Sequence, residues 1–419
     1  MFLSLKLTYL REIAPMTKNI QTKAFIASLV MAITATMTLN IAANAATKPA
    51  AKPATKPAAK VAPKPAVSTT QSASQTTTPA APPQAAPNTF SIALIGDMPY
   101  DALGVTQVPY IINEINASKI EFTLFGGDTM SGKGDKCTDE AYPALKTNFF
   151  NKFSKQIFYT IGDNEWVDCD RPVKGAFDPL TRLELVRSNY FGKNGAYINL
   201  GTTVLNSPGT STPVTILHDT VYPEMQMFTY KGITVIIPHI PGSANNMAIV
   251  DNTKCKTYND LEKDGDAAEF AARDAANVLW INKGFGKAYS DNALGVIVLT
   301  QANMDWEGYL AGQAMPNTEC TSAYNADKQA LLTNTLQFKK PVLLQNGDEH
   351  WFQLDMPMNE TAGKLVQRDK GSLVENFTRV QTFGSAFNHW VELVVDPSSS
   401  TLWSFKTHIV KENIANHGQ

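Results

Sequence analysis

Four aspartates in this chain stand directly after a glycine and just beyond a short run of apolar residues. One Gly-Asp after a strand is usually a turn, but four such dipeptides indicate a shared site. Apolar runs of this length are typical of strands buried on both faces, whose carboxyl ends form the usual site crevice of an open α/β sheet. Converging carboxylates repel one another unless a cation neutralises them. The pattern therefore predicts a divalent metal site at Asp97, Asp128, Asp163 and Asp348.

Three more polar side chains follow the same or neighbouring apolar runs. Gln301 and His350 extend the predicted ligand set, and Asn164 offers an amide beside it. A ligand set this rich in oxygen favours Mg²⁺, Mn²⁺ or Ca²⁺ over zinc. His239 follows another apolar run and is a candidate general acid, although a lone histidine at a strand end is more often structural.

Other chemistries find little support in the sequence. Residues 127–133 match the first part of a phosphate-binding P-loop, but Gly134 stands where the Mg²⁺-binding Ser or Thr belongs. Neither a Gly-x-Ser-x-Gly elbow nor a Gly-x-Gly-x-x-Gly dinucleotide motif after the first apolar run is present. The formal net charge of −2 provides no basic field to gather nucleic acid, so specific nucleic-acid binding is not expected.

The elements that must position these residues alternate between strands and helices. This alternation predicts an α/β fold with a parallel or mixed sheet covered by helices, in a single domain over 89–412 followed by a tail at 413–419. Residues 189–230 have weak periodicity and are predicted to be a loop-rich insertion. The expected strands are 90–95, 122–125, 157–161, 233–237, 296–299 and 342–344, the expected helices are 107–117 and 267–289, and a closing hairpin is expected from 388–396 and 401–410.

The N-terminal region has the features of an export signal followed by a spacer. Residues 1–45 combine lysines, an apolar run and Ala43-Asn44-Ala45, which suits cleavage by signal peptidase. The alternative is an uncleaved membrane anchor. Residues 46–88 are rich in Lys, Pro and Ala, so a disordered linker is expected, either solvated or in contact with the cell envelope. The predicted location is therefore periplasmic or secreted.

The chain has four cysteines, which suit an oxidising compartment. Four cysteines allow three pairings. Because Cys137 and Cys169 each lie shortly after a strand-end Gly-Asp, we expect them on neighbouring loops. The predicted pairs are Cys137–Cys169 and Cys255–Cys320.

The order of these segments resembles that of the calcineurin-like metallophosphoesterases, a superfamily that includes the purple acid phosphatases. The resemblance covers Phe90 to Asp355, and the chain to Val410 is similar to the family's final strands. It implies a four-layer α/β/β/α sandwich with mixed sheets and two divalent ions (Mn, Mg, Fe or Ca). The family pattern assigns Asp97 and His350 to the first metal, Asp128 as the bridging carboxylate, and Asp163, Asp348 and Gln301 to the second metal.

This sequence departs from the family pattern at two histidines. Pro99 replaces the first motif's histidine, and Asn164 replaces the histidine that assists the leaving group or the phosphate. The resemblance implies an exported phosphoesterase that hydrolyses a small phosphate mono- or diester by attack of a metal-activated hydroxide. Asn164 would donate a hydrogen bond to a phosphoryl oxygen, and protonation of the leaving group would need another acid, for which His239 is the candidate, or water. The missing histidines favour an alternative, a catalytically degenerate envelope-binding or interaction protein that retains the fold.

Overall fold

The computed structural model describes residues 89–193, 195–248, 265–304, 306, 322–368 and 370–415. The expected signal peptide and linker lie outside these residues, so the predicted boundaries at 45 and 88 stay predictions. Within the described part of the chain, no helix is long and apolar enough to cross a membrane.

Five strands form the first sheet, in the order β17-β16-β1-β2-β3. β1, β2 and β3 run parallel, whereas β16 pairs antiparallel with both β1 and β17. Parallel neighbours need long crossover connections, and helices make them here. The strands are β1 (Phe90–Ile95), β2 (Ile120–Phe125), β3 (Ile157–Tyr159), β16 (Trp390–Val395) and β17 (Trp403–His408).

Seven strands form the second sheet, in the order β11-β15-β10-β9-β8-β7-β6. Its four central strands β8, β9, β10 and β15 are parallel, and antiparallel strands continue the sheet at both edges. The strands are β6 (Leu217–His218), β7 (Gln226–Tyr230), β8 (Ile233–Ile237), β9 (Gly295–Leu299), β10 (Val342–Asn346), β11 (Gln353–Asp355) and β15 (Phe377–Gln381).

Two small sheets and a set of helices complete the described chain. One small sheet contains β12 (Asn359–Thr361), β13 (Lys364–Val366) and β14 (Ser372–Leu373), and the other contains β4 (Gly192–Lys193) and β5 (Ala196–Tyr197). The α-helices are α3 (Asp101–Ala117), α4 (Ala141–Asn148), α5 (Pro179–Val186), α6 (Gly242–Asn245), α7 (Ala267–Ser290), α9 (Asn325–Phe338) and α10 (Lys411–Ala415). Short helical turns are η1 (Phe150–Lys152), η2 (Val167–Asp170), η3 (Pro172–Lys174) and η4 (Arg187–Phe191).

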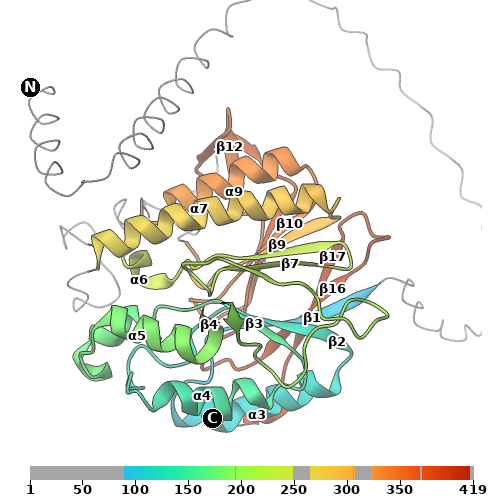
Figure 1. Ribbon diagram of the computed structural model, residues 1–419. Helices are drawn as coiled ribbons and strands as arrows, with labels where there is room; N and C mark the ends of the chain where they lie inside the picture. Colours follow the sequence, from blue (N-terminus) through green and yellow to red (C-terminus); the bar gives the residue numbers. More distant parts are fainter. Residues whose placement is uncertain are drawn as a thin grey trace, which may run out of the picture. The chain divides into compact units, whose positions relative to one another are not determined.

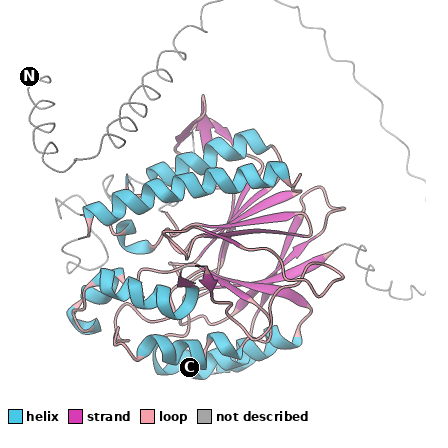
Figure 2. Cartoon of the chain, in the orientation of Figure 1, coloured by secondary structure: helices cyan, strands magenta, loops and turns pink. Residues whose placement is uncertain are grey.

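The two large sheets lie between two groups of helices. Helices α3, α4 and α5 lie outside the first sheet, and α7 and α9 lie outside the second (Figures 1 and 2). Alternate residues of β1 show how the strands serve two cores: Ile92 and Leu94 enter the apolar cluster between the sheets, whereas Ala93 and Ile95 pack under the helices. A further apolar cluster joins the second sheet to α7 and α9. The central strands are largely apolar because both of their faces are buried, as in β8 and β9.

The structure confirms a mixed α/β fold and a strand at each of the six predicted apolar runs, and it confirms the closing hairpin as β16–β17. The prediction for 189–230 is wrong in part, because β7 lies in this stretch and pairs along its full length with β8. Helix α9 has no counterpart among the predictions. Its buried face includes Asp327, Lys328 and Asn334, and buried polar residues obscure the apolar periodicity on which helix prediction depends.

Loops that follow β2 and β3 are joined covalently. Cys137 and Cys169 form a disulfide with a Cα–Cα distance of 5.8 Å, as predicted. Cys255 and Cys320 lie outside the described residues, so their pairing stays a prediction.

Packing between the sheets gives a direct test of the fold. Phe158 of β3 stacks on Phe228 of β7 with ring centroids 4.2 Å apart, and both side chains are buried. We expect Phe158→Ala to lower the free energy of unfolding by about 3–5 kcal/mol, because it leaves a cavity between the sheets. Leu279→Ala on the exposed surface of α7, where the side chain is 68% exposed, should change it by less than about 0.5 kcal/mol. Urea denaturation of both variants measures this, and equal small losses would contradict the packing.

Candidate functional site

Loops that follow strands of both sheets meet in one buried crevice. Asp97 follows β1, Asp128 follows β2 and Asp348 follows β10 of the second sheet. The backbone N–H of Asp348 donates to Asp97 Oδ1 over 2.9 Å, so the two sheets are linked at the site itself. The predicted convergence of the acidic strand ends is therefore present in the structure.

Asp97 is fully buried and only partly satisfied. Its Oδ1 lies 3.6 Å from His350 Nε2, and its Oδ2 receives no hydrogen bond from any described residue. Gly347 is required beside it, because a Cβ there would lie 2.3 Å from Asp97 Oδ2. Asp97 and His350 thus form one pair of candidate metal ligands, in which Asp97 Oδ2 has no hydrogen-bond partner among the described residues.

Asp128 is buried and, in contrast, saturated with hydrogen bonds. Its Oδ2 accepts from Tyr100 OH at 2.9 Å, Asn164 Nδ2 at 2.7 Å and Gln301 Nε2 at 3.4 Å. Its Oδ1 accepts from the Asn164 backbone N–H at 3.2 Å. A Cβ at Gly162 would lie 1.9 Å from this oxygen, so only glycine fits there. The structure thus brings Asn164 and Gln301 to Asp128, together with Tyr100, which the sequence did not reveal.

Asp163 and Asp348 face each other across Gly242. A Cβ at Gly242 would lie 2.9 Å from Oδ1 of each aspartate, so the missing side chain leaves the space between them open. Asp163 Oδ2 accepts from Ser243 Oγ at 2.6 Å, while its buried Oδ1 has no hydrogen-bond partner among the described residues. Asp348 Oδ1 accepts from Gln301 Nε2 at 3.2 Å. Asp163 and Asp348 therefore form a second pair of candidate metal ligands, and the amide of Gln301 lies beside them.

Burial and mutual repulsion dominate the electrostatics of the crevice. Burial, followed by the charges of Asp348 and Asp163, raises the pKa of Asp97 well above its usual range. Burial, followed by Asp163 and then Glu165, does the same to the pKa of Asp128. Burial lowers the pKa of His350, which keeps the imidazole neutral and able to bind a metal. A cation among these carboxylates would remove the repulsion.

The backbone at the site is strained in the manner of functional loops. Asp97, Asp128, Asp348 and His350 all have positive φ, at 54°, 60°, 80° and 69°. Residues other than glycine rarely adopt this left-handed region. Each one that does costs of order 1–3 kcal/mol, so the surrounding structure must hold it in place. The strain falls on the predicted ligands themselves, which indicates a local geometry held for a purpose other than stability.

The fit of these residues to a metal ion is incomplete but chemically consistent. Across the described residues, no three His, Cys, Asp or Glu side chains are arranged to hold a single ion. Each candidate position instead offers two such donors, Asp163 with Asp348 and Asp97 with His350. Each also has a buried carboxylate oxygen without a hydrogen-bond partner, Asp163 Oδ1 and Asp97 Oδ2. A hard divalent cation is the partner that such oxygens bind best.

Glu165 supports the crevice from behind. It is fully buried, and its Oε1 accepts from Tyr159 OH at 2.8 Å and from the backbone N–H of Thr129. Burial raises its pKa. These contacts tie the loop after β3 to the loop after β2, so Glu165 positions the crevice loops.

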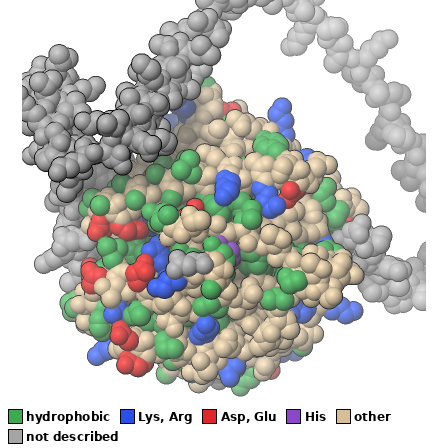
Figure 3. All heavy atoms as spheres, in the orientation of Figure 1, with side chains coloured by type: hydrophobic (Ala, Val, Ile, Leu, Met, Phe, Trp, Pro, Cys, Tyr) green, Lys and Arg blue, Asp and Glu red, His purple; other side chains and the backbone are tan. Residues whose placement is uncertain are grey.

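Cationic side chains line the crevice wall next to Asp163. Ser243 Oγ joins Asp163 Oδ2 to Asp168 Oδ1 over 2.6 and 2.7 Å, and Arg171 pairs with Asp168 at 2.5 Å. Buried Lys174 donates to the Ser131 carbonyl at 2.7 Å. Acidic and basic side chains also gather on the outer surface near α5, α6 and the start of α7 (Figure 3). Arg171 and Lys174 are not among the predicted site residues, although both lie within five residues of Cys169 on the disulfide-linked loop.

His239 is held in a buried ion-pair network instead of the acidic crevice. Its Nδ1 lies 2.9 Å from Glu224 Oε1, and Arg187 Nη2 binds the same oxygen at 2.7 Å. Burial, opposed by Glu224 and reinforced by Arg273, lowers the pKa of His239 to about 4. Burial alone would raise the pKa of Glu224, but its contacts with Arg187 and His239 outweigh burial and lower the pKa to about 2. The sequence pattern could not reveal these partners, which come from distant segments.

No family model matches the chain, and no curated protein matches it in sequence. Among solved structures, it is similar to a dimetal phosphatase from Danio rerio, with 8% identity and a TM-score of 0.36 over 77% of this chain and 99% of that chain. It is also similar to GAP50, the anchor in the inner membrane complex of Plasmodium, with 11% identity and a TM-score of 0.33 over 77% of this chain and 89% of that chain. A Vps29 mutant from Entamoeba histolytica aligns with 9% identity and a TM-score of 0.23 over 76% of this chain and 98% of that chain. These weak likenesses assign no activity.

The buried imidazole of His239 predicts a specific pH dependence of stability. The unfolded histidine protonates near pH 6.5, whereas the folded one stays neutral down to about pH 4. The unfolded state thus binds the extra proton, so this stability is present above about pH 6.5 and is lost as pH falls toward 4. We expect a loss of about 3 kcal/mol from this group. His239→Gln, which keeps a donor for Glu224, should lose less stability than the unmodified protein over this range in urea titrations. Parallel stability curves would contradict the assignment.

The two carboxylates across Gly242 predict a metal-dependent gain in stability. Adding Mn²⁺ at about a hundredfold excess over its Kd should stabilise the folded protein by about 2.7 kcal/mol, measured as a rise in Tm. Asp163→Asn should abolish most of this rise in Tm. In the presence of chelator, the Asp163→Asn variant should be more stable than the unmodified protein, because one repelling charge is gone. The exposed Asp139→Asn serves as a matched control. A rise in Tm that is unchanged in Asp163→Asn would place the metal elsewhere.

Proposed function

We propose that this chain is a metal-dependent phosphoesterase that hydrolyses a small phosphate mono- or diester, built on the α/β/β/α sandwich of the metallophosphoesterases. The observation that carries the proposal is the pair of buried carboxylate oxygens, Asp97 Oδ2 and Asp163 Oδ1, that lack hydrogen-bond partners among the described residues. A buried carboxylate oxygen without a partner needs an explanation, and a bound cation supplies one at these two oxygens because they belong to residues that face the other candidate ligands.

The donors divide into two proposed metal positions. Asp163 and Asp348 would hold one cation, and Asp97 with His350 would hold another, with Asp128 between them. The predicted ligand Gln301 faces Asp348 through its Nε2, while its side-chain oxygen accepts from the backbone N–H of Gly242, so its amide would have to turn to bind the same cation. Mn²⁺, Mg²⁺, Ca²⁺ or an iron ion suits such a set of oxygens with one imidazole. Bound cations would supply the positive charge that stabilises charge building up on the phosphoryl oxygens and the leaving oxygen.

Asn164 and Tyr100 are the proposed hydrogen-bond donors to the substrate. Asn164 Nδ2 lies 2.7 Å from Asp128 Oδ2 and 3.1 Å from Tyr100 OH. Burial, followed by the charge of Asp128, raises the pKa of Tyr100 well above its usual range, so its hydroxyl keeps its proton at neutral pH. An amide cannot release a proton either. Both groups would orient a phosphoryl oxygen once a cation at Asp128 replaces the hydrogen bonds that they donate to this carboxylate, and protonation of the leaving group falls to water.

His239 does not serve this proposal as an acid. Its contacts are with Glu224 and the ion-pair network, and a pKa of about 4 leaves little protonated imidazole at neutral pH. A guanidinium nevertheless lies beside Asn164, that of Arg171, which pairs with Asp168 at 2.5 Å. A Cβ at Gly132 would lie 2.9 Å from Arg171 Nη1 and 2.5 Å from Asn164 Oδ1. Because Asp168 balances the charge of Arg171, attraction of an anionic substrate would depend on the bound cations.

A second candidate function is a non-catalytic binding protein that retains the fold. The hydrogen bonds around Asp128 favour it, since Tyr100, Asn164 and Gln301 satisfy the proposed bridging carboxylate without any cation. In both cases we propose that the protein is exported to the periplasm or secreted, with an uncleaved N-terminal anchor as the alternative. The linker at 46–88 would place the domain away from its point of attachment or against the envelope.

Hydrolysis of nitrophenyl phosphate and bis(nitrophenyl) phosphate in added Mn²⁺ tests the proposal. We expect activity that chelation removes, and Asp128→Asn should lower kcat/KM by about 10²–10³ because the carboxylate that would lie between the two cations is lost and the cations bind less well. Asp139→Asn, on the exposed surface, should retain full activity. A folded protein that binds Mn²⁺ but hydrolyses neither ester would favour the binding protein.

A further inference from the structure

Hydrogen bonds divide the two carboxylate oxygens of Asp163 and of Asp97. Asp163 Oδ2 accepts from Ser243 Oγ at 2.6 Å. Asp97 Oδ1 accepts from the Asp348 backbone N–H at 2.9 Å. The other oxygen of each aspartate, Asp163 Oδ1 and Asp97 Oδ2, is buried and has no hydrogen-bond partner among the described residues. Each of these two side chains therefore presents a single oxygen to a cation.

The space beside Gly242 lies against the unpartnered oxygen of Asp163. A Cβ at Gly242 would lie 2.9 Å from Asp163 Oδ1 and 2.9 Å from Asp348 Oδ1, whereas Asp163 Oδ2 lies farther away. The oxygen of Asp163 that faces Asp348 is thus the one that the protein leaves without a donor. The second oxygen is taken up by Ser243.

Two buried side chains hold the hydroxyl of Ser243. Asp168 Oδ1 lies 2.7 Å from Ser243 Oγ. Arg171, which pairs with Asp168 at 2.5 Å, also places its Nη2 3.5 Å from this hydroxyl. A hydroxyl has one proton to donate. Because Arg171 offsets the charge of Asp168, the proton of Ser243 is left for Asp163.

A left-handed turn of the backbone carries Ser243. Residues 243–246 have φ values of 45°, 52°, 56° and 58°. Residues other than glycine seldom adopt this conformation in succession, so the turn must be held by its surroundings. Arg273 of α7 holds it, since its guanidinium donates to the Asn245 carbonyl at 2.7 Å and to the His239 carbonyl at 3.0 Å. The hydroxyl of Ser243 therefore has a fixed position beside the carboxylate.

Carboxylates that bind through one oxygen suit a small cation. Asp348 does not differ in this respect, because its Oδ1 accepts from Gln301 Nε2 and its Oδ2 accepts from the Asn303 backbone N–H, both at 3.2 Å. Mg²⁺ is usually bound by one or two carboxylates and keeps several waters in an octahedral shell, and Mn²⁺ accepts the same octahedral oxygen ligands. Ca²⁺ takes about six to eight oxygen ligands and often uses both oxygens of a carboxylate.

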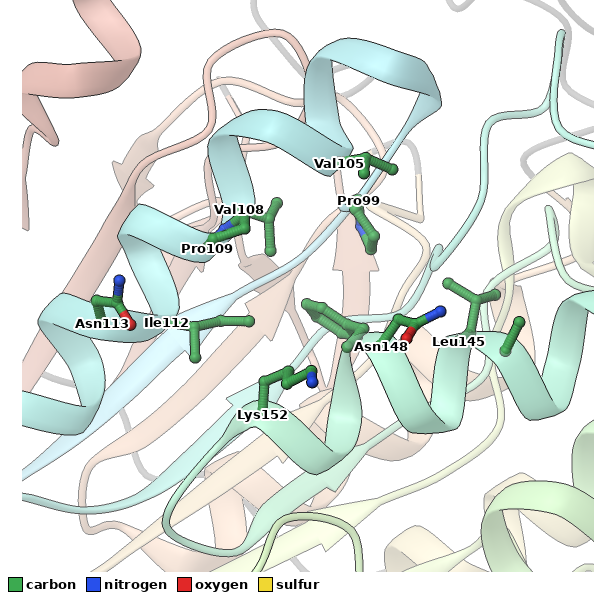
Figure 4. A pocket seen from close by; sticks show the side chains of 11 residues that line it. Pro99, Val105, Val108, Pro109, Ile112, Asn113, Leu145, Asn148 and Lys152 are labelled. Atoms are coloured by element: carbon green, nitrogen blue, oxygen red, sulfur yellow. The ribbon is translucent and has the colours of Figure 1, made fainter.

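A groove between helices α3 and α4 offers no comparable position for a cation (Figure 4). Its lining side chains are apolar apart from Asn113, Asn148 and Lys152, and none of them is a carboxylate. The ammonium group of Lys152 would repel a divalent cation. Competition between cations therefore reports on the crevice and not on this groove.

We propose that Ser243 determines the cation specificity of the proposed metal site, because its hydroxyl makes Asp163 a ligand through one oxygen and so favours Mn²⁺ or Mg²⁺ over Ca²⁺. The inference rests on the proposed metal-dependent function, since it concerns the cation between Asp163 and Asp348. Ser243 acts through Asp163 and is not itself a ligand. Without the hydroxyl, Asp163 Oδ2 would join Oδ1 in binding Ca²⁺, whereas Mn²⁺ would gain little.

Electron paramagnetic resonance of free Mn²⁺, with Ca²⁺ added to the full chain as competitor, tests the proposal. We expect the unmodified chain to bind Ca²⁺ at least about tenfold more weakly than Mn²⁺, and the ratio of the two Kd values to fall about tenfold in Ser243→Gly. Glycine adopts a positive φ without strain, so this variant loses the hydroxyl and keeps the turn. The Mn²⁺ binding that disappears in Asp163→Asn identifies the site.

Ala244→Gly is the matched control, because it relaxes the next left-handed position and keeps the hydroxyl. Its ratio of Kd values should equal that of the unmodified chain. The inference is overturned by an unchanged ratio in Ser243→Gly, by an equal fall in Ala244→Gly, or by equal affinity of the unmodified chain for both ions. Mn²⁺ selectivity without hydrolysis of either nitrophenyl ester would remove the proposed hydrolysis alone, and an absence of Mn²⁺ binding would overturn both.

Discussion

Repulsion among four aspartates, three buried and one half-buried, is the constraint on which the rest of this structure depends. Asp97, Asp128, Asp163 and Asp348 come from four loops and two sheets, and the charge of each neighbour makes ionisation of Asp97 and Asp128 harder. Such an arrangement persists only if the surrounding structure holds it, because separated carboxylates in water have a lower free energy. The packed aromatic core between the sheets supplies that restraint, since it fixes where the strands end.

Local devices then bring the carboxylates close. The missing side chain of Gly242 leaves the space between Asp163 and Asp348 open, and the missing side chains of Gly162 and Gly347 let backbone approach Asp128 and Asp97. The disulfide supports the same region from behind, because the sulfur atoms of its two cysteines lie 3.8 and 3.7 Å from the Asn164 carbonyl oxygen. Removing the aspartate charges without removing these supports would leave a more stable protein, which is the usual relation between a functional site and its fold.

The strands and the acidic loops were predictable from the sequence because both depend on local pattern. Apolar runs that end in Gly-Asp require no knowledge of the partner strands, and the structure places all four aspartates in one crevice. Tyr100, Arg171 and the partners of His239 were beyond reach, since their roles arise from contacts between segments far apart in the chain. His239 illustrates the limit: its position after β8 suggested the crevice, but its side chain pairs with Glu224, fifteen residues earlier in the sequence.

The arrangement of Asp128 bears most directly on whether the site is catalytic. Tyr100 and Asn164 donate hydrogen bonds to the carboxylate oxygen that would face the metals if Asp128 bridged two of them. A cation bound nearby would compete with these donors, so hydrogen bonding and metal binding at Asp128 are alternatives. The two proposed functions differ in which alternative the protein adopts in its cellular compartment.

The most direct measurement is a crystal structure of the full chain soaked in Mn²⁺, with anomalous scattering recorded to locate the metal. The account predicts a strong anomalous peak between the carboxylates of Asp163 and Asp348, within bonding distance of Asp163 Oδ1. A map without a peak in the crevice, while Asp128 keeps its hydrogen bonds to Tyr100 and Asn164, would contradict it.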